Sequence, residues 1–505
     1  MSGGGRRDIR ELYEAHAVIP ALDEQDVDPL RTLLEDTVGL EVRPAHRRYY
    51  PRADAACHII GVTGQVNERE LAAYNLPDGE PDRLTWLRDS YLGGEMIGKT
   101  GVEKMCEERL RGRRGYRVYR AGEVVDSEPA QPGADVHLTV DVQLQEATAA
   151  AFVQGKGDET GAVVVLDVQS GDVLAMVSIP TYDLNRYHER DYYRRLSGEL
   201  VSPPLLHRAL KLMCAPGSTA KPVAALAALG AGRITQHTIF ECIGGRFPHP
   251  QAPKCWIGSL GGEHGAIDLI EGLRYSCNVY FDHVGDVLGP DRLTEWYRRF
   301  GFGRRPGTGL PDEKAGVVLT DELSRKLANR DMNVGDAWQM AIGQGTFSAT
   351  PLQVANAMAT IARGGVFLSP VISLEGGPQR ERWDLPLSPD AVAAVHEGMR
   401  QVVHHHRGTA HRYLDGPELD ALGFEFCGKT GTAQVPPQWI DSDGDGRADQ
   451  VVRSGDHAWF AGFAPAGNPQ IAFAVLVEYA GSGGSNAGPI ALDIVRICRD
   501  FGYIK

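Results

Sequence analysis

The sequence predicts a mixed α/β protein whose central sheet joins strands from distant parts of the chain. Two observations carry this prediction. Apolar, β-branched runs near residues 161–178 and again near residues 458–479 are typical of buried strands. The sequence between these two regions is rich in helix-forming residues. Strands at both ends of a helix-rich segment indicate one α/β unit rather than separate helical and sheet domains.

Residues 1–134 are charged and mixed in character, with short helical patterns at Asp26–Glu35 and Gly101–Leu110. A Pro-Gly turn follows, and after it we expect a short strand at Val136–Val140. Apolar runs become denser from this point to the end of the chain. We therefore predict one domain over residues 1–134 and a second over residues 135–505.

The second domain opens with a predicted hairpin. Gly161–Val168 and Val173–Ser178 are strand-like and flank a four-residue turn. Pro222–Gly230 is rich in Ala and Leu and predicts a helix. Ala458–Ala464 and Gln470–Tyr479 predict two further strands.

Composition excludes several classes of protein. The chain has 505 residues, of which 42% are apolar and 23% charged, an ordinary globular balance. The formal net charge of −14 argues against a nucleic-acid partner, which requires a basic face. No run approaches the roughly 20 apolar residues that span a bilayer, and Met1–Arg7 lacks the apolar core of a signal peptide.

The main nucleophile candidate is Ser218, within Ala215-Pro-Gly-Ser-Thr-Ala-Lys-Pro222. Gly217 permits a sharp turn, and the helix that follows places Ser218 near an N-terminus, where the helix dipole favours developing negative charge. Lys221 is three residues further on, so the two side chains share one helical face. A buried lysine can lose its proton near neutral pH and activate a hydroxyl for attack on an acyl carbon. A capping serine beside a surface lysine is the alternative.

Two more motifs follow along the chain. Ser276-Cys277-Asn278 offers a hydroxyl and a carboxamide that could relay a proton and hold a substrate backbone, with a polar loop as the alternative. Lys429-Thr430-Gly431-Thr432 offers a positive charge, hydroxyls and a strand edge that can accept a peptide.

Together and in this order, Ser-x-x-Lys, Ser-x-Asn and Lys-Thr-Gly form the motif set of penicillin-binding proteins and related serine β-lactamases. The chain resembles a class B penicillin-binding protein of the cell-elongation type over about residues 40–505. The resemblance is carried by Ala162–Asn185, Leu206–Pro222, His264–Phe281, Gly343–Pro351, Gly428–Gln434 and His457–Pro465, with Tyr91–Lys104 upstream. It implies an α+β fold, in which a partial non-catalytic pedestal precedes a transpeptidase domain with a central antiparallel sheet and a helical subdomain.

The resemblance also implies a reaction, D,D-transpeptidation without a catalytic cofactor. Ser218 would be acylated by the D-Ala-D-Ala end of a stem peptide, with Lys221 as general base. Ser276 and Asn278 would move protons and bind substrate. Lys429, Thr430, Gly431 and Thr432 would receive the carboxylate of the substrate or of a β-lactam. The N–H groups of Ser218 and Thr432 would form the oxyanion hole.

The implied ligands are peptidoglycan stem peptides and β-lactams. The implied partners are a membrane glycosyltransferase and elongation-complex proteins, and the implied location is the extracytoplasmic face of the membrane. Because the sequence has no membrane span, we expect the natural protein to begin upstream of Met1.

Three other activities share these motifs: a serine β-lactamase, a D,D-carboxypeptidase that uses water as acceptor, and a penicillin-binding sensor or scaffold without turnover. The long N-terminal region favours a transpeptidase over a β-lactamase. A sensor usually lacks the nucleophile or the base, whereas Ser218 and Lys221 are both present.

Four residues between the nucleophile and the end of the Ser276 motif predict a structural zinc site. Three thiolates and one imidazole suit tetrahedral zinc, and the residues are Cys242, Cys255, His264 and Cys277. Some elongation-type relatives resemble this pattern, with Cys, Asp and His ligands at matching positions. The alternatives are a Cys242–Cys255 disulfide, free buried cysteines, and His249 as a replacement ligand.

A second metal candidate is an acidic loop with the Asp-x-Asp-x-Asp-Gly start of a calcium site, formed by Asp441, Asp443, Asp445 and Asp449. Val452 stands where an EF-hand needs a glutamate, so a solvated acidic turn is the alternative. Gly93–Thr100 matches the P-loop pattern. A P-loop follows a buried strand, whereas the residues before Gly93 are charged and polar. We therefore predict no nucleotide binding.

Overall fold

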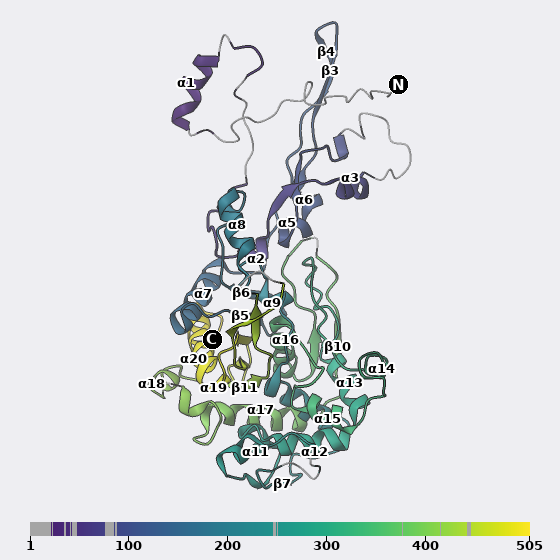
Figure 1. Cartoon of the computed structure of the whole chain (residues 1–505), viewed down its shortest axis with the longest axis vertical. Coiled ribbons are helices and arrows are strands. Elements are labelled where there is room, and N and C mark those ends of the chain that lie inside the picture. Colours follow the sequence, from purple (N-terminus) through teal and green to yellow (C-terminus); the bar gives the residue numbers. More distant parts are fainter. Residues whose placement is uncertain are drawn as a thin grey trace. The chain divides into compact units, whose positions relative to one another are not determined.

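The computed structural model describes residues 22, 24–34, 37–40, 42, 48–75, 85, 88–245, 249, 251–375, 377–414, 416–441 and 446–505 (Figure 1). Met1–Tyr50 and Pro51–Lys505 form two compact units. The first contains α1 (Glu24–Leu34), where the sequence predicts a helix. All elements given below belong to the second unit. Among the described residues, no helix combines the length and apolar character needed to cross a membrane.

Residues 51–134 contain short helices and two antiparallel strand pairs, β1–β2 and β3–β4. The elements are α2 (Cys57–Ile60), β1 (Thr63–Gln65), α3 (Glu68–Tyr74), β2 (Met96–Gly98), α5 (Gly101–Met105), α6 (Glu107–Arg111), β3 (Tyr116–Arg120) and β4 (Glu123–Glu128). The helix predicted at Gly101–Leu110 is interrupted at Cys106, between α5 and α6. Lys99, in the P-loop-like stretch, forms an ion pair with Glu70.

The central sheet has the order β11-β14-β15-β5-β6, and all neighbouring strands are antiparallel. Its strands are β5 (Gly161–Asp167), β6 (Val173–Ile179), β11 (Cys427–Ala433), β14 (His457–Ala464) and β15 (Ile471–Val477). The predicted hairpin and the joining of sequence-distant strands are confirmed. The predicted strand at Val136–Val140 is wrong: Leu138 makes only an isolated bridge to Ser373, because this segment runs beside irregular chain rather than a strand.

Alternate side chains of the sheet enter two different cores, as the twofold repeat of a strand requires. Val163 and Val165 belong to the core that contains residues of α7 (Val142–Lys156) and α20 (Gly488–Asp500). Val164 and Leu166 belong to the other core, with α16 (Pro351–Ala362) and α10 (Lys221–Gly230). Figure 1 shows α7 and α20 on one side of the sheet and α16 on the other.

The chain between β6 and β11 forms the helical subdomain and carries four of the short strands. Its remaining elements are α8 (Arg190–Gly198), α9 (Arg208–Lys211), β7 (Phe240–Cys242), β8 (Gly265–Ile267), α11 (Leu269–Arg274), α12 (Asn278–Leu288), α13 (Pro290–Arg299), α14 (Asp321–Ala328), α15 (Val334–Ala341), β9 (Val366–Leu368), β10 (Arg382–Asp384), α17 (Pro389–His404) and α18 (Gly416–Asp420). After β11 come the hairpin of β12 (Gln438–Ile440) and β13 (Gln450–Arg453), then α19 (Gly483–Asn486) between β15 and α20.

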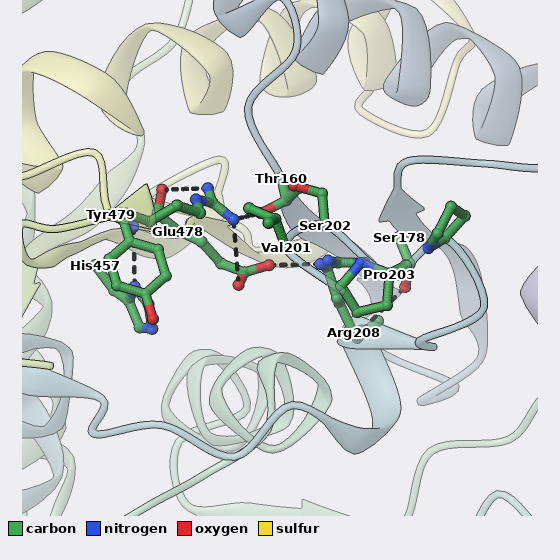
Figure 2. A network of polar contacts seen from close by, with 12 residues as sticks. Thr160, Ser178, Val201, Ser202, Pro203, Arg208, His457, Glu478 and Tyr479 are labelled. Carbon is green, nitrogen blue, oxygen red and sulfur yellow. Dashed lines mark hydrogen bonds and ion pairs between the residues drawn. The ribbon is translucent and has the colours of Figure 1, made fainter. Parts of the chain in front are cut away.

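A buried ion-pair network holds the segment that leads to Ser218 (Figure 2). The Arg208 side chain, 1% exposed, donates from Nε to the Glu478 carboxylate and from Nη1 to the Pro203 carbonyl over 2.9 Å. Arg453 donates to the Thr160 hydroxyl over 2.7 Å and to the Glu478 carbonyl over 3.2 Å. The network therefore fastens α9 to the end of β15, the start of β5 and the β12–β13 hairpin.

Candidate active site

Ser218 lies in a 3₁₀ turn, Gly217–Ala220, that leads directly into α10. Gly217 has a φ of +54°, and a Cβ atom there would lie 2.6 Å from the Thr432 carbonyl oxygen. Only glycine tolerates both conditions without strain. The glycine therefore lets the Ser218 turn approach the backbone of β11, as the predicted oxyanion hole of Ser218 and Thr432 requires.

Lys221 is fully buried and connects the nucleophile helix to the Ser276 loop. Its Nζ donates to the Ser276 carbonyl over 2.8 Å, to the Ser276 hydroxyl over 3.2 Å and to Asn278 Oδ1 over 2.7 Å. Burial lowers the pKa of Lys221 to about 8. Within the described part of the chain Ser218 Oγ has no hydrogen-bond partner. A nucleophile–base hydrogen bond often forms only when substrate binds.

Lys429, on β11, also contacts Ser276. Its Nζ donates to the Ser276 hydroxyl over 2.8 Å and to the Thr430 carbonyl over 2.9 Å. Burial, together with the charge of Lys221, lowers the pKa of Lys429 well below its usual value. The Ser276 hydroxyl thus bridges two buried amines and can exchange protons with either of them.

Backbone geometry fixes the Ser276 loop between α11 and α12. Ser276 has a φ of +52°, which is uncommon outside glycine. Cys277 caps α12 through its Sγ, which accepts from the Tyr280 N–H. The Asn278 amide donates to the Lys254 carbonyl over 2.9 Å, so its oxygen faces Lys221. The three sequence motifs therefore meet at one point.

These groups open into a cleft of about 860 Å³. It contains Ser218, Ser276, Asn278, Thr430, Gly431 and Thr432. Two residues that the sequence analysis did not select lie beside them. Thr409 Oγ1 is 2.8 Å from Thr430 Oγ1, and Gln344 Nε2 donates to the Thr432 carbonyl over 3.0 Å. Thr409 comes from a segment without a motif. Gln344 lies in Gly343–Pro351, a stretch that carries the family resemblance but to which no catalytic role was assigned.

Comparison with known proteins agrees with this geometry. The family model of the penicillin-binding protein transpeptidase domain matches residues 161–496, and that of the penicillin-binding protein dimerisation domain matches residues 8–138. The chain belongs to the penicillin-binding transpeptidases. Within that family it is of class B and of the cell-elongation type.

The curated relatives of this penicillin-binding protein include enzymes of cell-wall synthesis. The chain is 33% identical to the peptidoglycan D,D-transpeptidase MrdA of Haemophilus influenzae. The alignment covers 94% of this chain and 73% of the MrdA sequence. A Helicobacter pylori PBP2 in complex with MreC superimposes with a TM-score of 0.80 at 27% identity, covering 96% and 84% of the two chains. A Pseudomonas aeruginosa PBP2 in complex with WCK 5153 gives 0.74 at 32% identity, covering 90% and 91%.

The four residues of the predicted zinc site lie together beside the Ser276 loop. The candidate ligand atoms of Cys242, Cys255, His264 and Cys277 all lie within 4.8 Å of one another. His264 Nδ1 is 3.5 Å from both Cys242 Sγ and Cys255 Sγ, and the Sγ atoms of Cys255 and Cys277 are 3.8 Å apart. None of the eight cysteines forms a disulfide in this structure. His249 is not in the cluster and contacts Trp338 instead.

Asp282 is a buried acid that the sequence analysis also missed. It lies on α12 four residues after Asn278, on the same helical face. Its side chain is fully buried, and neither carboxylate oxygen has a hydrogen-bond partner among the described residues. Burial raises the pKa of Asp282 to about 8, against the opposing effect of Lys221. Its spacing from Asn278 was visible in the sequence, but its burial was not.

The acidic loop of the predicted calcium site is described only in part, since Asp443 and Asp445 lie outside the described residues. Asp441 Oδ2 accepts from the Gly446 N–H over 2.7 Å, and the Asp449 N–H donates to the Ile440 carbonyl over 2.9 Å. These contacts join described residues on the two sides of that segment. Calcium binding therefore stays a prediction.

Proposed function

We propose that this penicillin-binding protein carries out peptidoglycan D,D-transpeptidation through an acyl-enzyme on Ser218. D,D-transpeptidation is the activity of the family; the residue roles are our inference. The observation that carries them is the convergence of Lys221 and Lys429 on the Ser276 hydroxyl, beside Ser218 and the edge of β11.

In the acylation half-reaction, neutral Lys221 accepts the Ser218 proton as Oγ bonds to the carbonyl carbon of the penultimate D-alanine. The N–H groups of Ser218 and Thr432 stabilise the oxyanion; removing one such donor typically costs about 3–4 kcal/mol in the transition state. The proton then passes from Lys221 through the Ser276 hydroxyl to the amine of the departing D-alanine. Asn278 holds the substrate backbone, and Lys429 with Thr430 receives the terminal carboxylate.

In the second half-reaction the steps run in reverse, with an amine of another stem peptide in place of D-alanine. The amine attacks the ester carbonyl, its proton returns to Ser218 through the same relay, and the peptide cross-link is released. A β-lactam opens on Ser218 in the same way, but its leaving nitrogen stays attached, so the acyl-enzyme persists.

Mass spectrometry tests the nucleophile directly. The intact protein incubated with benzylpenicillin should gain the mass of one penicillin, and Ser218→Ala should gain none. Ser482→Ala, in the same cleft but outside the three motifs, is the matched control and should be labelled. Rapid loss of the adduct by hydrolysis would instead support a β-lactamase. Product analysis with and without an acceptor amine separates transpeptidation from carboxypeptidation.

The proposals for the location and the partners of this protein rest on its relatives. We propose that the chain works at the extracytoplasmic face of the membrane with elongation-complex proteins and a membrane glycosyltransferase. The support is the resemblance to a PBP2 bound to MreC. We keep the boundary at residues 134 and 135, four residues before the match of the dimerisation-domain model ends at residue 138.

We further propose that the cysteine–histidine cluster holds a structural zinc ion. A tetrahedral site with Zn–S near 2.3 Å and Zn–N near 2.0–2.1 Å requires S···S separations of about 3.8 Å and S···N separations of about 3.5 Å. The separations of His264 Nδ1 from Cys242 Sγ and Cys255 Sγ, and of Cys255 Sγ from Cys277 Sγ, agree with these values. A disulfide would need sulfur atoms about 2 Å apart. The ion would fix Cys277, and with it the loop that carries Ser276 and Asn278.

Metal analysis of protein purified without chelator tests this proposal. One zinc per chain is expected, falling in a Cys255→Ser variant. Cys498→Ser, which removes a buried thiol outside the cluster, is the matched control. Zinc-free wild-type protein with undiminished penicillin labelling would contradict the proposal. For the acidic loop, a calorimetric titration without heat at millimolar calcium would exclude calcium binding.

A further inference from the structure

Two exposed arginines that line the cleft, Arg407 and Arg412, each donate to a tyrosine hydroxyl. Arg407 donates from Nη1 to the Tyr275 hydroxyl over 3.2 Å, and Arg412 donates to the Tyr413 hydroxyl. The guanidinium carbons lie 5.6 Å and 4.5 Å from the centroids of the same tyrosine rings. All four side chains line the cleft that contains Ser218. The Tyr275 hydroxyl also accepts from Arg274 over 2.7 Å. Each cleft arginine therefore has one tyrosine contact that favours a position facing the cleft.

Neither arginine has a carboxylate partner in the part of the chain that the structure describes. Neighbouring arginines outside the cleft do: Arg274 pairs with Glu271 over 2.7 Å, and Arg400 pairs with Glu425 over 2.8 Å. The chain has a formal net charge of −14, so carboxylates are plentiful. A guanidinium carries five N–H donors, and most of those on Arg407 and Arg412 remain available to a ligand.

The loop that carries these arginines is attached to the proposed substrate strand. Thr409 lies between them in sequence, and its hydroxyl shares a hydrogen bond with the hydroxyl of Thr430 on β11. Its N–H donates to the Arg274 carbonyl over 3.3 Å. The loop between the two arginines is therefore held against the strand that receives the peptide.

We propose that Arg407 and Arg412 form a subsite for a second carboxylate of the peptide substrate. This inference rests on the proposed function, in which Lys429 and Thr430 already receive the terminal carboxylate. The second group would be a free side-chain carboxylate on a stem peptide, which a guanidinium fork can bind through two parallel hydrogen bonds. This carboxylate could belong to the donor peptide or to the acceptor peptide. Measuring the acylation and transfer half-reactions separately shows which peptide the subsite binds.

A diffuse electrostatic role makes different predictions from a subsite. A positive cleft wall would attract every anionic ligand, would be weakened by salt, and would be preserved by lysine in place of arginine. A subsite discriminates between a carboxylate and a carboxamide at one position of the peptide. It also requires the planar fork, so lysine restores it only in part.

The test uses two matched peptides that end in D-Ala-D-Ala. The preceding residue is 2-aminopimelic acid in one, with a carboxylate at the end of a four-carbon side chain, and its side-chain carboxamide in the other. D-Alanine release reports the donor half-reaction. For the acceptor half-reaction, 2-aminopimelic acid or its side-chain carboxamide is supplied as the acceptor amine. Transfer of the acyl group to each of them is then measured. The readout is the ratio of kcat/KM for the carboxylate to that for the carboxamide.

We expect the wild-type protein to prefer the carboxylate by roughly tenfold in one half-reaction, in line with a charge-assisted hydrogen bond. Arg407→Gln plus Arg412→Gln should bring the ratio close to one, and the two lysine variants should restore it incompletely. Arg400→Gln, which changes an arginine outside the cleft lining that is paired with Glu397 and Glu425, should keep the wild-type ratio. An unchanged ratio in the double glutamine variant, or full restoration by lysine, would overturn the subsite.

Labelling of the same preparations with benzylpenicillin separates the two possible failures. Protein that is labelled on Ser218 but shows no change of selectivity overturns the subsite alone. Wild-type protein without any label overturns the proposed function, and the subsite with it.

Discussion

Two buried networks of this protein differ in whether each cation has a carboxylate partner. In the network of Figure 2, Arg208 is paired with Glu478, and Arg453 Nη1 lies 3.9 Å from the carboxylate of the same glutamate. In the active site, Lys221 and Lys429 are buried just as completely, but their hydrogen bonds go to hydroxyl, amide and carbonyl oxygens.

The difference separates structural from chemical use of a buried charge. A buried cation beside an anion stays charged, and the pair fixes neighbouring segments. A buried lysine without an anion is stabilised as the neutral amine, because desolvation penalises the ammonium form. The pKa values of both active-site lysines are accordingly lowered. The four predictions below test this distinction, from the largest expected effect to the smallest.

Removal of the active-site amine should have the largest effect. Lys221→Met keeps the aliphatic part of the side chain but supplies no base, so acylation by benzylpenicillin should slow by about 10²- to 10⁴-fold. Stopped-flow or quenched labelling measures the rate. Lys211→Met removes a partly exposed lysine that pairs with Asp312 and should leave the rate near wild type. A Lys221→Met protein that reacts at the wild-type rate would remove the assigned base.

Removal of the Glu478 carboxylate from the Arg208 network should lower the free energy of unfolding and leave the acylation rate unchanged. Glu478→Gln leaves the buried charge of Arg208 without compensation, and such a loss typically costs about 3–5 kcal/mol. Denaturant unfolding measures it. Asp331→Asn breaks the exposed pair with Arg325, whose side chains are both 62% exposed, and should cost about 0–1 kcal/mol. Equal losses in the two variants would contradict a special role for the buried pair.

The acylation rate should depend on pH through Lys221. Only the unprotonated amine can accept the Ser218 proton, and burial lowers the pKa of Lys221 to about 8. The rate should therefore rise by about tenfold per pH unit up to roughly pH 8 and then level off. Rates of penicillin labelling from pH 6 to 9.5 test the curve. A flat profile across this range would mean that the lysine does not titrate where its environment predicts.

Asp282 should make the stability of the protein depend on pH, and its contribution to stability should fall as the pH rises. Its folded pKa, raised to about 8 by burial, lies above that of an unfolded aspartate near 4. Its contribution to stability is therefore present below about pH 4 and is lost as the pH rises towards 8. Asp282→Asn should be more stable than wild type by on the order of 2 kcal/mol at pH 8.5, with a smaller gap at pH 5. Thermal melts at both pH values measure the difference, and a constant gap would contradict the assignment.

The local part of this architecture could be predicted from sequence. The hairpin of β5 and β6, the strands β14 and β15, and the helix α10 follow from residue patterns within single segments. The Val136–Val140 strand failed because extended chain becomes a strand only when a partner strand is available elsewhere. The predicted Gly101–Leu110 helix divides at Cys106, although its residues favour a helix throughout.

The sequence by itself determined the spacing of Ser218 and Lys221, the glycine that allows their turn, and the residue types of the three motifs. These are properties of a few consecutive residues, so backbone chemistry is sufficient to express them. The tertiary structure alone decided that Ser276 lies between two lysines, that Thr409 reaches Thr430, and that Asp282 is buried without a partner. Those facts depend on contacts across long stretches of chain, and burial, which shifts the pKa values, exists only once the chain has folded.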